Sequence, residues 1–287
     1  MAAHGPAAGV AGLTASATRV GRDGTLALRV EQCGGRSVLA GCRWTLPLQV
    51  LAPVALDDPA AVVWMLNPTG GLVGGDRLAV EVDVGPRAHA CLTTPSATKV
   101  YRTAGATAEQ TVRLTLAPHA RLEWVPDHTI PFAGAALRQR VEAQVPQGAS
   151  LLLVDAFAAG RIARGERWRF ALLDSTLSVR DARGWLLHDR LVLRGGAPGS
   201  GLGSAEDWPY IATVVVVADA DLAAFADDVA ALVADDVDVG AALLPRRGVL
   251  VRCLAANAPA LGRAIEALWA AARRRVLDLP ALALRKP

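Results

Sequence analysis

Short segments in which apolar and polar residues alternate recur along most of this chain, from about residue 25 to residue 193. A period of two places apolar side chains on one face of an extended backbone, so each segment predicts a half-buried strand. Turn residues, such as Gly85-Pro86, separate the segments, and no helical spacing lies between them. Together with continuous apolar runs at 61–66 and 150–156, the predicted strands cover residues 25–30, 37–42, 61–66, 78–84, 88–93, 111–116, 121–125, 137–145, 150–156, 167–172, 176–180 and 185–193.

This pattern predicts a mainly β protein, either a large β-sandwich or a helically wound β body. No strict repeat period of the kind that marks a regular solenoid is present in the sequence. We expect a flexible tail over residues 1–14 and a single domain over 15–287. Within that domain, the β body covers about 15–195, and a glycine-rich connection follows at 195–203.

The pattern changes near residue 208, where an αβ portion extending to about 280 is predicted. Residues 210–218 and 248–254 read as strands, and helical spacing indicates helices over 219–234 and 257–277. Asp219 or Asp221 is the expected N-cap of the first helix. In the second helix, Arg263, Arg273 and Arg274 are expected to face solvent.

Composition excludes several functional classes. The chain has 287 residues, 52% of them hydrophobic and 20% charged, with a net charge of +3. It has no dense basic run and no RNA-binding aromatic motif, which argues against nucleic acid as a partner. Its apolar runs, such as residues 211–218, are too short to cross a bilayer, and residues 1–13 lack the features of a signal peptide.

The four cysteines are scattered and form no Cys-x-x-Cys pair, which argues against structural zinc and against a disulfide scaffold. We therefore expect a cytoplasmic protein with reduced thiols and no membrane attachment.

Two glycine pairs, Gly70-Gly71 and Gly74-Gly75, flank Leu72-Val73 and lead the chain into Asp76-Arg77. The phosphate-binding loop requires Lys-Ser or Lys-Thr after its last glycine, and an aspartate at that position would repel phosphate. A strand follows the glycines where the dinucleotide fingerprint requires a helix. The glycine pairs therefore predict a tight loop at a sheet edge.

Carboxylates in or beside apolar strands are the candidate functional groups. A carboxylate in such a position is costly unless it is paired with arginine, hydrogen-bonded, or in contact with water or metal. One interpretation is a set of buried ion pairs, and the other is a hydrophilic path of oxygen ligands for a passing divalent cation. The residues are Asp76, Glu123, Asp155, Glu166 and Asp189.

Several motifs in one order resemble the signature regions of the urease accessory protein UreD (UreH) family. They are the run NPTGGLVGGDRL, then TTPSATKVYR, then LEWVPDHTIPF at residues 122–132, and finally Gly160-Arg161 followed by Gly165-Glu166. The similarity is strong over about residues 39–193 and weaker elsewhere.

The resemblance implies a non-enzymatic chaperone that acts with UreF and UreG to deliver Ni²⁺ to the urease apoprotein. Nickel would be in transit and not a tightly bound cofactor, and a dimer of complexes is one assembly that fits. The family's positions implicated in an internal nickel passage correspond to Asp76, Thr98, Asp155 and Asp189. Glu123 joins this candidate set because it lies in an apolar strand.

The chain also departs from the family pattern at three places. Val62-Val63 stands where many members carry Cys-His, so a soft ligand pair is missing. Asp127-His128 follows Pro126, and the sequence ends in Leu-Arg-Lys-Pro where the family commonly has Pro-Arg-Ile-Trp.

Two other functions stay open at the sequence level. One is an all-β hydrolase or lyase that uses paired carboxylates such as Glu123 and Asp155, and the other is a plain β scaffold for protein contacts. His128 beside Asp127 and His188 beside Asp189 are weaker candidates, because adjacent strand residues point to opposite faces. His89 lies at a turn and is expected to be solvated.

Overall fold

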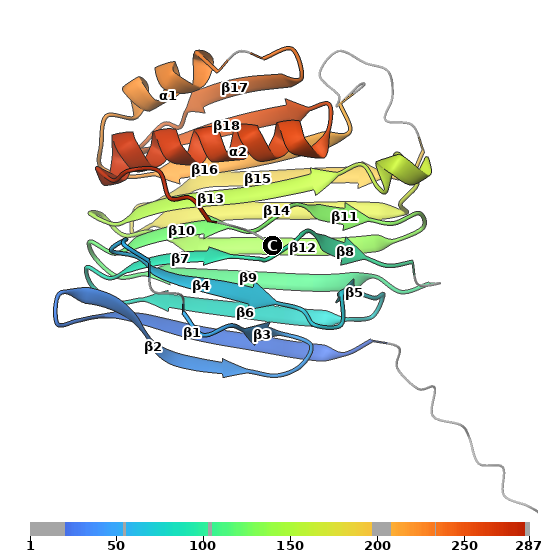
Figure 1. Ribbon diagram of the computed structural model, residues 1–287, viewed down its shortest axis with the longest axis horizontal. Coiled ribbons are helices and arrows are strands. Elements are labelled where there is room, and N and C mark those ends of the chain that lie inside the picture. Colours follow the sequence, from blue (N-terminus) through green and yellow to red (C-terminus); the bar gives the residue numbers. More distant parts are fainter. Residues whose placement is uncertain (1–20, 54–55, 103–104, 197–207, 233, 285–287) are drawn as a thin grey trace, which may run out of the picture.

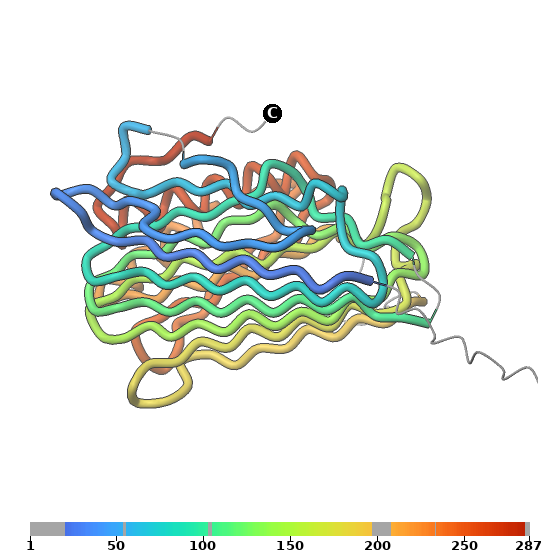
Figure 2. Tube along the Cα trace, turned by 90° about the horizontal axis from the view of Figure 1, so that it is seen from below, coloured from blue at the N-terminus to red at the C-terminus, as the bar shows by residue number. Residues whose placement is uncertain are grey.

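The computed structural model describes residues 21–53, 56–102, 105–196, 208–232 and 234–284 (Figure 1). The predicted tail at 1–14 and most of the predicted connection at 195–203 lie outside these ranges. The described chain forms two stacked sheets, with two helices against the outer face of one of them (Figures 1 and 2).

The first sheet has seven strands in the order β15-β14-β12-β9-β6-β1-β2. These strands are β1 (Asp23–Cys33), β2 (Arg36–Trp44), β6 (Arg77–Val84), β9 (Ala108–Leu116), β12 (Ala136–Gln144), β14 (Leu172–Asp181) and β15 (Gly184–Arg194). We call it the front sheet.

The second sheet has eleven strands, and we call it the back sheet. Its main order is β17-β18-β16-β13-β10-β7-β4-β3, and β5, β8 and β11 pair at one end of it. The strands are β3 (Gln49–Val50), β4 (Ala61–Leu66), β5 (Gly71–Leu72), β7 (His89–Thr93), β8 (Thr98–Val100), β10 (Arg121–Val125), β11 (Thr129–Pro131), β13 (Ser150–Ala158), β16 (Tyr210–Val217), β17 (Val237–Leu243) and β18 (Gly248–Ala255).

The chain winds between the two sheets as it advances. It visits β6 in front, β7 behind, β9 in front, β10 behind, β12 in front and β13 behind, and neighbours within each sheet run parallel. Parallel neighbours require a crossover connection, and here the opposite sheet supplies it. The predicted helically wound β body is therefore confirmed.

Two cores follow from this winding. Alternating side chains of the strands meet between the sheets, and a second apolar cluster lies between the back sheet and the helices. Strand β13 contributes to both, because Leu151 and Leu153 point between the sheets while Leu152 and Val154 point toward the helices. Burial on both faces explains why this strand is a continuous apolar run.

The C-terminal strands extend the back sheet, since β16 pairs antiparallel with β13 and β18 pairs with β16. Helix α1 (Leu222–Ala230) begins after Asp221, whose carboxylate accepts from the Ala224 N–H at 3.1 Å. Helix α2 (Ala258–Ala272) begins after Asn257, which caps it in the same way, and a π-helical turn (Arg273–Leu277) follows.

Sequence and structure agree on most of the longer strands, while the short strands β5, β8 and β11 were not predicted. The predicted strands at 61–66 and 121–125 coincide with β4 and β10. The strand predicted over 167–172 is wrong, because Trp168 adopts a left-handed φ of 58° and the chain turns there before β14. Strand β17 was not predicted, since Gly240-Ala241-Ala242 gives no alternation.

Candidate functional site

A cavity between the two sheets is the candidate site. Apolar side chains from both sheets form most of its wall, including Leu26, Leu78, Val80, Val112, Trp124 and Val141. Polar side chains gather along one part of it: Asn67, Thr94, Thr98, Gln110, Asp127, Thr129, Gln139 and Asp155. Two of the predicted site residues, Thr98 and Asp155, therefore line the same cavity.

Asp155 extends from β13 of the back sheet toward the front sheet. Gln139 of β12 donates its Nε2–H to Asp155 Oδ1 at 2.8 Å, and Ser175 of β14 donates its hydroxyl to Oδ2 at 2.8 Å. Burial raises the pKa of Asp155 to about 6, and these two hydrogen bonds offset part of that rise. The pKa of this carboxyl therefore lies well above that of an ordinary aspartate and within about one unit of neutral pH.

Polar contacts continue from Asp155 to the edge of β15. Thr213 of β16 stands opposite Asp155 in the strand register, and its hydroxyl accepts from the Arg252 guanidinium. Arg252 Nη2 also donates to Asp189 Oδ1 at 2.6 Å. Asp189 raises the pKa of Asp155 and Arg252 lowers it, so the three charged groups share one region. Asp155 and Asp189, chosen from sequence, thus lie in one polar region with Thr213 and Arg252, which were not.

Thr98 enters the cavity from β8, where its N–H donates to the His128 carbonyl at 3.1 Å. Strands β8 and β11 run parallel, and their register places Thr98 beside Thr129, a second cavity hydroxyl. Among the residues that the structure describes, no three His, Cys, Asp or Glu side chains are grouped as a resident metal ion would need. The cavity therefore offers scattered oxygen donors and not a closed coordination shell.

Asp76 holds the glycine loop together. Its carboxylate accepts from the Arg22 N–H at 2.8 Å and from the Val73 N–H at 2.9 Å, and only 3% of the residue is exposed. Gly71 sits at a φ of 152°, and a Cβ there would lie 2.2 Å from the Lys99 carbonyl oxygen. The two glycine pairs and Asp76 thus form the predicted tight loop, which packs against the strand that carries Thr98.

Glu123 lies on the opposite face of the back sheet, under the helices. It accepts from His89 Nε2 at 2.7 Å, from Arg273 Nη1 at 2.6 Å and from the Trp269 indole N–H. Burial opposes ionisation of Glu123, but the hydrogen bond and charge of His89 and the charge of Arg273 hold its pKa below the usual range. The structure therefore does not bring Glu123 to the cavity.

Two sequence predictions fail at this cluster. Arg273 was expected in solvent, yet it is fully buried, since it pairs with both Glu123 and Asp58 and donates Nε–H to the Pro280 carbonyl at 2.8 Å. His89 was expected to be solvated, yet it is 3% exposed because it bonds Glu123. The helical spacing predicts that residue 273 lies in a helix. It does not identify the partners of the Arg273 side chain, because Asp58 and Glu123 come from distant parts of the chain.

The remaining site residues predicted from sequence do not contact the Asp155 carboxyl group in the cavity. Glu166 pairs with Arg161 in the turn before β14. His188 contacts the Ser178 hydroxyl at 3.0 Å on the outer face of the front sheet, while Asp189 points inward. Glu123 and Asp155 occupy opposite faces of one sheet, so this pair has no shared substrate position.

The fold and the cavity together define a helically wound β scaffold whose interior presents oxygen donors. The sequence profile of the UreD urease accessory protein family matches residues 22–287. The chain belongs to this family.

Individual relatives show the same similarity. The urease accessory protein UreD of Klebsiella aerogenes is 36% identical over 195 residues, which is 68% of this chain and 71% of the relative. The UreD protein of Pseudomonas putida is 34% identical over 256 residues, covering 89% and 90% of the two chains. That of an Anaeromyxobacter species is 35% identical over 271 residues, covering 91% and 87%. Across the described ranges, no helix has both the length and the apolar character needed to cross a bilayer.

Proposed function

We propose that this protein is a non-enzymatic urease maturation chaperone. It acts with UreF and UreG to insert nickel into the active site of the urease apoprotein. The observation that carries the nickel part of the proposal is the line of polar groups from Thr98 through Asp155 to Asp189. It runs from the cavity to the β15 edge between two apolar sheets. Family membership supports the maturation role.

The oxygen ligands of the cavity favour transit of Ni²⁺ over its storage. Hydroxyl, amide and carboxylate oxygens hold a borderline cation such as Ni²⁺ less tightly than thiolate or imidazole ligands do. Cys253 is buried, and burial raises the pKa of its thiol to about 12, so it stays neutral and is a poor ligand. Val62-Val63 stands at the position of the family's Cys-His pair, which is consistent with passage past oxygens.

The other named candidates have structural roles in this proposal. Asp76 uses both carboxylate oxygens on backbone N–H groups, and Glu123 is committed to Arg273, His89 and Trp269. In this proposal the energy for transfer comes from GTP hydrolysis in UreG, and the lack of a phosphate-binding loop in this sequence agrees with that division of roles. A dimer of the resulting complexes belongs to the same proposal.

Urease activation tests the proposal directly. Apo-urease, UreE, UreF, UreG and nickel are supplied in one host, with and without this chain, and urease activity is measured. Activity that depends on the chain is the expected result, and no activation by soluble chain with matched partners would overturn the maturation role.

Substitution then tests the passage. D155A should lower activation at least several-fold, while D83A, which removes an exposed carboxylate on β6, should not. Equal activation by soluble D155A and wild type would remove the passage and leave the maturation role standing.

A further inference from the structure

The outer face of the front sheet carries its charge unevenly. Parallel registers align its outward side chains in rows across the strands. On β12, β14 and β15, which we call the positive half, five arginines face outward against two carboxylates. On β1, β6 and β9, three arginines face five carboxylates, and Arg36 and Arg43 of the neighbouring β2 stand in register with the outward-facing Cys33 and Ala27, so that side is close to neutral. The first set is Arg138, Arg140, Glu142, Asp174, Arg180, Arg190 and Arg194, and the second is Asp23, Arg29, Glu31, Arg77, Glu81, Asp83, Glu109 and Arg113.

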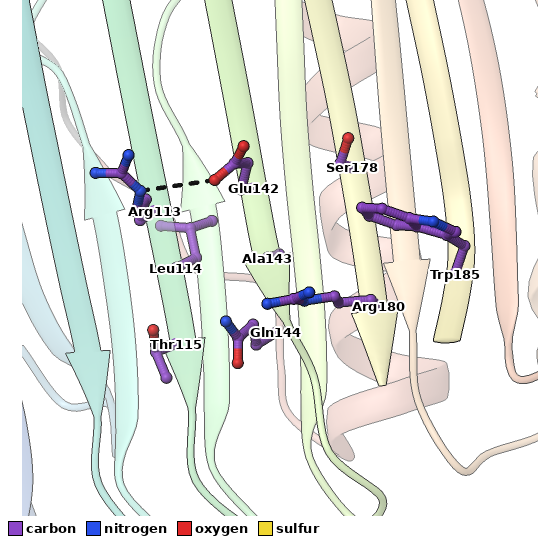
Figure 3. A pocket seen from close by; sticks show the side chains of 9 residues that line it. All are labelled: Arg113, Leu114, Thr115, Glu142, Ala143, Gln144, Ser178, Arg180 and Trp185. Carbon is purple, nitrogen blue, oxygen red and sulfur yellow. Dashed lines mark ion pairs between the residues drawn. The ribbon is translucent and has the colours of Figure 1, made fainter. Parts of the chain in front are cut away.

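A shallow hollow lies where β9 adjoins the positive half, above the ends of β9, β12 and β14 (Figure 3). The Arg113–Glu142 ion pair, with Nε and Oε2 3.6 Å apart, stands on one side of it. On the other side, Arg180 reaches from β14 toward Gln144, and the Trp185 ring lies beside it. Within the described chain, no carboxylate pairs with the Arg180 guanidinium.

Trp185 is exposed but held on rigid backbone. Sixty per cent of the residue is exposed, which is the largest value for a large apolar side chain in the described chain. Arg246, from the β17–β18 turn, donates to the Trp185 carbonyl at 2.8 Å and binds both carboxylate oxygens of Asp181. The ring also packs against His188, with centroids 5.7 Å apart. An exposed tryptophan on fixed backbone loses little freedom when a partner covers it.

We propose that this hollow, with Trp185 and Arg180 at its rim, docks an acidic surface of a protein partner in the maturation complex. A carboxylate from the partner pairs with Arg180, and an apolar side chain covers the Trp185 ring. The inference rests on the proposed function because that function supplies the partner. A second copy of this chain fits less well, since most outward carboxylates of its β1, β6 and β9 are already paired, as in Arg29–Glu31, Arg77–Glu109 and Arg113–Glu81. Nucleic acid fits less well because Glu142 and Asp174 would face its phosphates.

The test compares two variants in the hollow with two matched controls on the same sheet. W185A and R180E are paired with W44A, whose tryptophan is 42% exposed at the end of β2, and with R77E on β6. Binding of the full chain to purified UreF, UreG and urease apoprotein is measured separately, at low and at high salt. We expect W185A and R180E each to weaken binding to one partner at least tenfold. The loss in R180E should shrink at high salt, and both controls should stay within twofold of wild type.

Other outcomes assign the surface differently. If W185A and R180E bind all three proteins as wild type does, the docking proposal is overturned and the maturation role is unaffected. If the wild-type chain binds none of the three, both proposals fall. Self-association in sedimentation experiments that R180E abolishes would make the hollow a contact between copies. Binding of a labelled single-stranded DNA that R180E abolishes would make it a nucleic-acid site, and either result would overturn the proposal.

Discussion

The two buried carboxyl groups Glu123 and Asp155 have different surroundings and therefore different roles. Glu123 is surrounded by donors that hold it ionised, whereas Asp155 has two neutral donors and a raised pKa. The first arrangement fixes structure, because every charge in it has a partner. The second leaves a carboxyl whose charge can change near neutral pH, which suits a group that meets a cation.

Replacing Arg273 should destabilise the fold strongly. R273M leaves the carboxylates of Glu123 and Asp58 buried without their cation, and breaking a buried pair in this way costs roughly 3–5 kcal/mol. The free energy of unfolding, measured by urea denaturation, should fall by that amount. R263M is the control, since its ion pair with Asp236 is exposed and contributes about 1 kcal/mol or less. Equal losses in the two variants would contradict the structural role of Arg273.

Asp155 should make stability depend on pH in a defined direction. Its folded pKa of about 6 lies above the ordinary value of 3.8, so the fold favours the protonated form. The contribution of Asp155 to stability is therefore full at low pH and is lost as the pH rises through about 6. D155N removes this titration, so its stability relative to wild type should increase by about 1–3 kcal/mol between pH 4 and pH 7.5. Urea denaturation of both proteins at each pH measures the change, and a constant difference would refute the raised pKa.

The glycine loop depends on backbone angles and close packing that only glycine allows at Gly71. At Gly71, a side chain would need a φ of 152° and would meet the Lys99 carbonyl. G71A should lower the free energy of unfolding by about 2–4 kcal/mol, since both the φ angle and the space exclude a Cβ. G240A in β17 is the control, because a Cβ there meets nothing within 4 Å, and its effect should stay below about 1 kcal/mol. Thermal denaturation of both variants checks this, and a G71A protein as stable as G240A would rule out a steric role for the glycine.

Sequence patterns predicted those elements whose own residues determine them. Strands β4 and β10 were found because apolar runs between turn residues have few alternatives, and the cap at Asp221 follows from local chemistry. Strand β17 was missed because its small residues are strand-forming only through pairing with β18. The same limit applies to the site. Asp155 was a candidate from sequence, but its link to Asp189 through Arg252 depends on the register of β13, β16 and β18.

At the scale of the whole molecule, the local stability of each strand depends on whether the strand lies inside a sheet or at its edge. Each inner strand of the solenoid is paired on two sides, while β2, β3, β15 and β17 lie at sheet edges. Amide hydrogen exchange should therefore be slowest in β9, β10, β12 and β13 and fastest in these four edge strands. Mass spectrometry of exchanged peptides measures this order, and protection of β17 equal to that of β10 would contradict it.

The cluster around Arg273 has a consequence for how the protein is made. Arg273 lies 215 residues after Asp58 and 150 residues after Glu123, so a ribosome synthesises both carboxylates long before their shared cation. Until residue 273 leaves the exit tunnel, Glu123 of β10 and Asp58 before β4 lack their shared cation, and the apolar face beside them is not yet covered by α2. A chain that stopped before α2 would leave that face exposed. Synthesis of α2 and Arg273 is therefore the step that covers it, and products truncated before α2 should be substrates for proteases.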